Sequence, residues 1–257
     1  MNVFVFDIET VPDTKTGRIL YHLEKESDQE VAEIMLKKRQ EKTGSTFLPH
    51  HLQRIIAISG ALRRKDQFKI ASLGGINASE QELIGSFFKC IEKYLPILVS
   101  WNGSGFDLPV LHYRALLHGI SSPSYWNIGD DSDTSFRWNN YLSRYHYRHS
   151  DLMDILAGYQ GRSNAPLTEI ALMLGLPGKL NMEGAQVWDY FLQGKLEAIR
   201  DYCEIDVLNT YLIYLRFELI RGKLTPEVYQ KECAYAKECI SQEKKSHFEE
   251  FVKIWKN

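Results

Sequence analysis

The chain has 257 residues, and 44% of them are hydrophobic, which is enough for one large domain or two small ones with a sizeable core. Its formal net charge of −2 excludes the overall positive field that would by itself indicate a nucleic-acid-binding protein. It has no run of about 18 apolar residues and no signal-peptide pattern, so we expect a cytoplasmic protein without a membrane partner. The four cysteines lack the spacing of metal ligands and are expected to be reduced thiols.

The first segment, residues 2–9 (NVFVFDIE), is rich in Phe and Val and apolar on both faces, which predicts a strand in the middle of a sheet. A highly charged segment, residues 21–42, follows, and its apolar residues recur at roughly helical intervals up to Thr43-Gly44. We therefore interpret residues 11–50 as an insert that carries a helix.

Two β-rich segments, residues 54–62 and 68–73, are separated by a short polar stretch and predict a hairpin. The first three strands would then form a meander. Ser79 with Glu82 three residues later is a capping-box pattern, and the apolar residues after it follow the helical period. This helix is expected to end at Pro96.

The rest of the chain is mainly helical in pattern. Residues 97–101 predict a fourth strand, and residues 121–148 form an irregular region crowded with aromatic and arginine side chains. Helices are expected at residues 108–118, 167–174, 184–192 and 195–221, with a last one from Thr225. This order predicts one α/β domain with a mixed sheet, with a core of about residues 1–220 and a helical extension of about residues 221–257.

Asp7 and Glu9 lie two residues apart in the first predicted strand, so their side chains project from the same face of the sheet. Two like charges held together are destabilising unless a cation lies between them, and carboxylate oxygens suit Mg²⁺ or Mn²⁺. The alternative is an exposed strand end with two solvated acids.

A third acid, Asp107, follows the predicted fourth strand and opens a helix in the segment WNGSGFDLPVL. An ordinary helix N-cap would explain it equally well. However, the turn also places Asn102 and Phe106 beside it, at the carboxyl end of a strand, where open α/β sheets bind ligands.

A fourth acid, Asp206, lies one helical turn after Tyr202 in the segment RDYCEIDVLNTYLIYL, so the two side chains share a helix face. Tyr202 could instead be an ordinary core aromatic. Asp201 and Glu204 point elsewhere on this helix and are expected to be solvated.

These segments together resemble the DEDD exonuclease superfamily, which has a ribonuclease H-like fold with a mixed five-stranded sheet flanked by helices. FDIET is similar to its first motif, WNGSGFD to its second, and Tyr202 to Asp206 to the tyrosine form of its third. The likeness is in particular to stand-alone exonucleases related to the proofreading domain of family B DNA polymerases. A rival third motif of the histidine type, His149 with Asp154, is also present, and Asp151 and Asp154 otherwise become structural candidates.

The resemblance implies a 3'-5' exonuclease that acts on single-stranded nucleic acid with two divalent cations, Mg²⁺ or Mn²⁺. Asp7, Glu9, Asp107 and Asp206 would hold the ions, and Tyr202 would orient the attacking water. Thr10, Asn102 and Phe106 would bind the 3'-terminal nucleotides. DNA is the favoured substrate, and the alternatives are an exoribonuclease or a catalytically silent binding module.

The aromatic region, residues 121–148, is a second candidate nucleic-acid surface, because it places aromatic faces beside cations. The alternative is a folded segment that packs its own aromatic rings.

Overall fold

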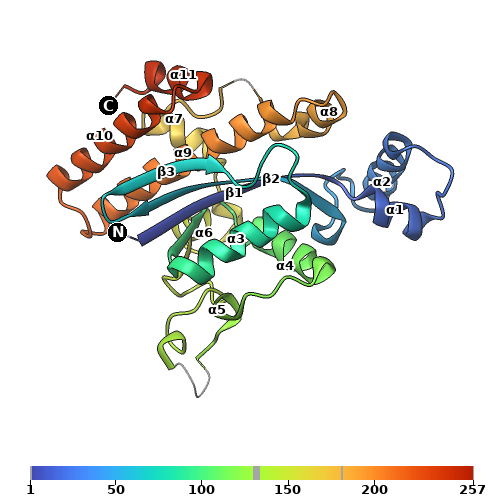
Figure 1. Ribbon diagram of the computed structural model, residues 1–257, viewed down its shortest axis with the longest axis horizontal. Coiled ribbons are helices and arrows are strands. Elements are labelled where there is room, and N and C mark those ends of the chain that lie inside the picture. The colour runs from blue at the N-terminus through green and yellow to red at the C-terminus, as the bar shows by residue number, and fades with distance from the viewer. Residues whose placement is uncertain (1, 130–133, 181, 257) are drawn as a thin grey trace.

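A computed structural model describes residues 2–129, 134–180 and 182–256. Its sheet has the strand order β3-β2-β1-β4-β5 (Figure 1). The strands are β1 (Asn2–Pro12), β2 (Gln53–Arg64), β3 (Gln67–Ser72), β4 (Ile97–Ser100) and β5 (His149–Asp151). β1, β2 and β3 pair antiparallel as the predicted meander, whereas β4 pairs parallel with both β1 and β5. The prediction of a mixed five-stranded sheet in an α/β fold is confirmed.

β1 is buried on both faces because its side chains alternate between two hydrophobic cores. Val3 and Val5 belong to the core on one face, and Phe4 and Phe6 belong to the core on the other. The pairing of β1 with β2 shifts register just after Glu9, so the strand is irregular where its acidic residues lie.

Helices cover both faces of the sheet. α3 (Glu80–Tyr94) and α4 (Asp107–His118) lie on the Phe4 side, and α9 (Leu196–Ile220) lies on the Val3 side with α7 (Leu167–Met173) beyond it (Figure 1). The capping box of Ser79 with Glu82 starts α3 as predicted, and Gly119 ends α4 in the left-handed conformation.

The chain beyond α9 differs from the prediction of one last helix. It forms α10 (Pro226–Gln242), capped by Thr225 as expected, and a second helix, α11 (Ser246–Ile254). Between them Lys244 has a φ of 50°, a left-handed conformation that interrupts the helix. The predicted helix of residues 184–192 is likewise two pieces, η4 (Gly184–Gln186) and α8 (Val187–Leu192).

The insert forms two helices with a small core of their own. α1 (Thr14–Tyr21) and α2 (Asp28–Thr43) lie at one end of the molecule (Figure 1), and α2 ends at Gly44 as predicted. The loop after α2 leads to η1 (His50–Leu52). The side chains that form this core are Val31, Met35, Leu48 and Leu52.

The aromatic region folds partly around its own rings. It contains α5 (Pro123–Trp126) and η2 (Thr134–Phe136), and its residues 130–133 lie outside the described part of the chain. Tyr125 and Tyr141 are buried and stacked with centroids 5.6 Å apart, whereas Trp138 is 83% exposed. The remaining short helices are α6 (Leu152–Leu156) and η3 (Gly161–Ser163).

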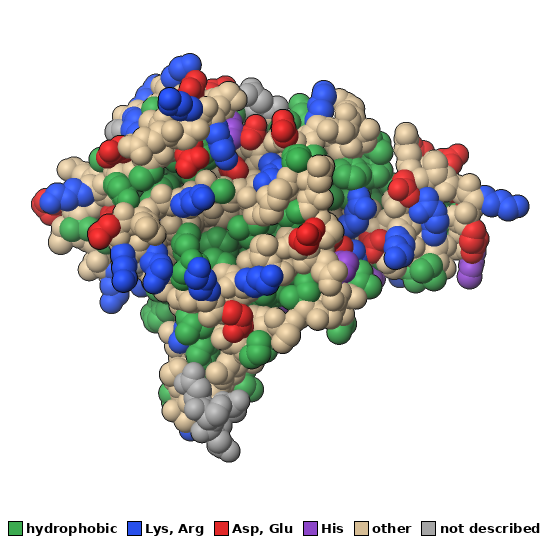
Figure 2. Space-filling model, viewed as in Figure 1, with side chains coloured by type: hydrophobic (Ala, Val, Ile, Leu, Met, Phe, Trp, Pro, Cys, Tyr) green, Lys and Arg blue, Asp and Glu red, His purple; other side chains and the backbone are tan. Residues whose placement is uncertain are grey.

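On the face seen in Figure 2, basic and acidic side chains are interspersed, in keeping with the formal net charge of −2. Among the helices of the described residues, none is both long enough and apolar enough to span a bilayer.

Candidate active site

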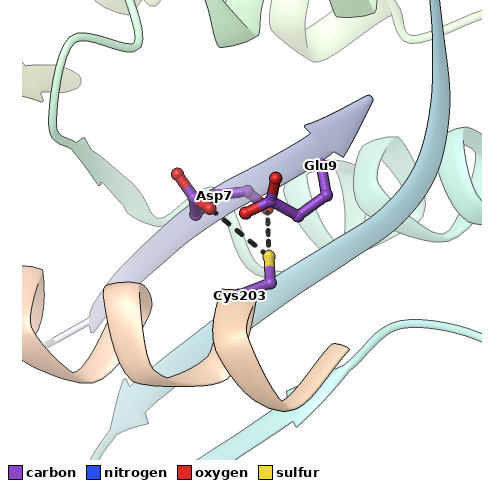
Figure 3. Close-up of side chains that lie close together, drawn as sticks. All are labelled: Asp7, Glu9 and Cys203. Atoms are coloured by element: carbon purple, nitrogen blue, oxygen red, sulfur yellow. Dashed lines mark hydrogen bonds between the residues drawn. The ribbon is translucent and has the colours of Figure 1, made fainter. Parts of the chain in front are cut away.

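Asp7 and Glu9 project from β1 toward α9, as their spacing predicts (Figure 3). The Cys203 thiol of α9 lies beneath them, with Sγ 3.4 Å from both Oδ2 and the main-chain oxygen of Asp7. The alternative of a solvated strand end is wrong, because Glu9 is only 8% exposed. The sequence analysis treated Cys203 as an ordinary thiol, although its position next to Tyr202 in the third motif could have indicated that it adjoins the acids.

Asp107 is the first residue of α4, whose N-cap position is occupied by Phe106. Its Oδ1 atom accepts a hydrogen bond from the Ile8 main-chain N–H at 3.1 Å, so the carboxylate lies against β1 between Asp7 and Glu9. The alternative of an ordinary N-cap is therefore wrong. The turn before α4 requires glycine at Gly103, because a Cβ atom there would collide with Ser100 Oγ.

Tyr202 and Asp206 are both buried on the face of α9 that meets β1. Burial raises the pKa of the Asp206 carboxyl, whereas Lys179 and the nearby Tyr202 hydroxyl oppose this rise. Asp206 Oδ1 is buried and has no hydrogen-bond partner among the described residues. A buried carboxylate oxygen without a partner is costly, so a ligand for it is expected.

The pKa of each of the four carboxyl groups is raised by burial, and those of Asp7 and Glu9 are raised further by the neighbouring acids. Burial raises the pKa of Asp7 well above its usual value, and Asp107, Glu9 and Asp206 raise it further. Burial and then Asp206 and Asp107 raise the pKa of Glu9 in the same way, although Lys179 opposes this. Burial raises the pKa of Asp107 to about 7 and that of Asp206 to about 6. The four acids thus form a cluster whose charge is incompletely neutralised by the protein.

This donor set fits hard divalent cations. It supplies carboxylate oxygens from β1, α4 and α9, and Asp206 Oδ1 is free to accept a metal. Ligand atoms of Asp7, Glu9 and Cys203 also lie within 4.8 Å of one another. The site can therefore hold metal ions, with Mg²⁺ and Mn²⁺ best matched to its oxygens.

The three residues expected to bind nucleotides lie in different surroundings. Thr10 Oγ1 donates a hydrogen bond to Gln53 Oε1 at 3.0 Å. Asn102 lines a cleft of about 530 Å³ that includes Arg144. Phe106 is half-buried, directly before Asp107.

The rival histidine motif has other partners. His149 is buried, lies 2.8 Å from Ser100 Oγ, and has a pKa that burial lowers to about 4. Asp154 pairs with Arg144 at 2.6 Å on the surface. Asp151 accepts hydrogen bonds from the N–H groups of Asn102 and Ser104, so it holds the turn that leads to Asp107, as its structural interpretation predicts.

The expectation that Asp201 and Glu204 are solvated is wrong for Glu204, which is 3% exposed. Its carboxylate accepts hydrogen bonds from Ser72 N–H and Lys245 Nζ. His247 lies between the two acids, with Nδ1 3.1 Å from Asp201 and Nε2 3.0 Å from Glu204. Both ring nitrogens face carboxylates, which indicates an imidazolium that joins α11 to α9.

We expect the stabilising effect of His247 to depend on pH. Burial lowers the pKa of His247, but hydrogen bonds to Asp201 and Glu204 outweigh this effect and raise the pKa above its usual value. The stabilisation is therefore complete below the unfolded pKa of about 6.5 and is lost as the pH rises through the higher folded pKa. Denaturant unfolding between pH 5 and pH 9 would measure this. The wild type should have a higher free energy of unfolding than His247→Gln at low pH, and this difference should shrink as the pH rises. A difference that stays constant would contradict the imidazolium assignment.

The sheet order and the helices on both faces, with acidic side chains converging from the central strand and from α9, define a ribonuclease H-like protein. Residues 45–255 match the model of a family described as a predicted 3'-5' exonuclease related to the exonuclease domain of PolB. The chain belongs to this family. The match includes Asp107, Tyr202 and Asp206, whereas β1 with Asp7 and Glu9 precedes it.

A DNA polymerase of Archaeoglobus fulgidus is 29% identical to the chain over 147 residues. The alignment covers 54% of this chain and 17% of the polymerase. The similarity is thus confined to a small part of the polymerase.

Proposed function

We propose that the protein is a metal-dependent 3'-5' exonuclease that removes nucleoside 5'-monophosphates from single-stranded nucleic acid. The observation that carries this proposal is the convergence of four carboxylates from β1, α4 and α9, of which Asp7 is half-buried and the other three are buried, and Asp206 has an unpartnered oxygen. DNA is the favoured substrate because the curated relative is a DNA polymerase.

In this proposal Asp7, Glu9, Asp107 and Asp206 would hold two divalent cations, and Asp7 would be the ligand that the ions share. Glu9 and Asp206 would complete the site that activates water, and Asp107 would serve the other site. When bound, the two ions supply an activated water and stabilise the leaving 3'-oxygen. The hydrogen bond from Ile8 N–H fixes the Asp107 carboxylate. Thr10, Asn102 and Phe106 would bind the terminal nucleotides.

Tyr202 keeps its proton and orients the attacking water in this proposal. Burial raises the pKa of its hydroxyl above the usual value, and the acids Asp206, Glu9 and Asp7 raise it further. A phenol in this environment is a hydrogen-bond donor and not a general base at neutral pH.

We expect Tyr202→Phe to lower kcat roughly 10²-fold with a much smaller change in KM, because orientation of the water matters mainly in the transition state. Single-turnover kinetics on a short DNA strand would measure this. An unchanged kcat would remove Tyr202 from the chemistry, and a loss confined to KM would make it a substrate-binding residue.

The direct test of the proposed function uses one single strand labelled at either end, incubated with Mg²⁺ or Mn²⁺. A 3'-5' exonuclease releases the 3' label as a mononucleotide at once and converts the 5'-labelled strand to a descending ladder. Matched DNA and RNA strands in competition would establish the sugar preference. Binding without shortening would indicate a silent binding module, and internal fragments would indicate an endonuclease.

A further inference from the structure

Three aromatic rings form a cluster at the start of α4: Phe47 from the loop after α2, His50 from the start of η1, and Phe106 from the N-cap position of α4. Phe47 lies 5.5 Å from Phe106, and His50 lies 5.8 Å from Phe106 and 6.5 Å from Phe47, as centroid distances. The rings are tilted by 53° to 78° to one another, so none of them lies flat on its neighbour. Phe106 directly precedes Asp107, so the cluster lies at the end of α4 that carries one of the proposed metal ligands.

Phe47 is exposed although its backbone is firmly held. Its side chain is 55% exposed, whereas the next residue, Leu48, is buried in the core of the insert. Its carbonyl accepts a hydrogen bond from Arg39 Nε at 2.9 Å, and its N–H donates to Ser45 Oγ at 3.1 Å. Phe47 thus presents apolar ring surface to water while it contacts Phe106 and His50.

The insert is fixed to the helix that carries Asp107. Asp13, which caps α1, forms a buried ion pair with Arg114 of α4 at 2.5 Å. The Asp13 N–H also donates to the carbonyl of Leu52 in η1 at 2.9 Å. The insert that carries Phe47 is therefore attached to α4, the helix that begins at Asp107.

We propose that Phe47 is a base-stacking residue, by which the insert binds unpaired bases of the strand as its 3' end enters the acidic site. This inference rests on the proposed function and assigns to it a binding residue outside the three motifs. Unpaired bases are the occupants that the surface fits, because every base has an apolar face that stacks on an aromatic ring without sequence preference. The ring lies beside a site for phosphodiester groups and carries no charge that would select a protein partner.

The test measures binding and hydrolysis of a single strand that carries the fluorescent base 2-aminopurine near its 3' end. In the presence of Ca²⁺, Phe47→Ala should raise Kd roughly 5- to 150-fold, the range for losing one stacked base. It should also abolish the fluorescence quenching caused by stacking. With Mn²⁺ it should raise KM and leave kcat nearly unchanged, because stacking contributes equally to ground state and transition state.

Matched variants separate stacking from packing. Phe47→Trp should retain quenching, Phe47→Leu should keep the apolar contact with Phe106 but lose quenching, and Ile19→Ala should behave as the wild type. Ile19 is an exposed apolar residue of α1 and serves as the control on the same insert.

Normal quenching and affinity in Phe47→Ala and Phe47→Leu, while the wild type shortens the strand, would overturn the role of Phe47 alone. A wild type that neither binds nor shortens any strand would overturn the proposed function together with it.

Discussion

Replacing Asp7 with alanine is expected to lower the rate of 3' shortening roughly 10³-fold or more. Asp7 is the ligand that both ions would share in the proposed mechanism, and each of the other three acids raises its pKa. Losing a shared ligand removes several kcal/mol of charge stabilisation in the transition state, and each 1.36 kcal/mol is about tenfold in rate. Single-turnover digestion of a 5'-labelled strand with saturating Mn²⁺ would measure the loss.

The matched control is Asp201→Ala, which removes a carboxylate from the same helix as Asp206 but from the His247 cluster. This variant should retain wild-type activity. Loss of activity in Asp201→Ala with retention in Asp7→Ala would move the chemistry to the second cluster, whose ligand atoms also lie within 4.8 Å of one another.

Asp7→Asn in EDTA should unfold at the same temperature as the wild type or higher, because it relieves like-charge repulsion.

Arg114→Met is expected to lower the free energy of unfolding by about 3–5 kcal/mol, the usual effect of removing one partner from a buried ion pair. Arg114 is 5% exposed and contacts two carboxylates, those of Asp13 and Glu80, at 2.5 Å each. Without the guanidinium, the Asp13 carboxylate would remain buried without its ion-pair partner, and the insert would lose this ion pair with α4. Urea unfolding at neutral pH would measure the change.

Arg18→Met is the control for this prediction. Arg18 pairs with Asp28 at 2.6 Å within the insert, but the Asp28 side chain is 64% exposed. Water screens such pairs, so the change should be within about 1 kcal/mol. If Arg114→Met also lowered the free energy of unfolding by only about 1 kcal/mol, the ion pair would not be what holds the insert in place.

The parts of the fold that the sequence predicted well are those specified by neighbouring residues. The Ser79 capping box, the helix ends at Gly44 and Gly119 and the alternation in β1 are local patterns, and all appear in the structure. β5 was missed because it has only three residues, His149–Asp151, which are polar although buried. Such a short strand has no period to detect, and its parallel partner β4 alone specifies it.

The candidate acids were likewise found by local patterns, whereas their surroundings depend on distant parts of the chain. Glu204 was misassigned because its partners Lys245 and His247 lie 41 and 43 residues further on. Phe47 was not singled out, because only the folded insert brings it to Phe106. Whether Asp107 caps its helix or lies against β1 is likewise a tertiary property.

The most direct test is the anomalous difference map of a crystal soaked with Mn²⁺ and a nucleoside 5'-monophosphate. We expect two peaks roughly 3.5–4 Å apart among Asp7, Glu9, Asp107 and Asp206, with the phosphate bridging them. No manganese among these four acids beside a bound nucleotide, or manganese only between Asp201, Glu204 and His247, would contradict the assignment of these acids as metal ligands.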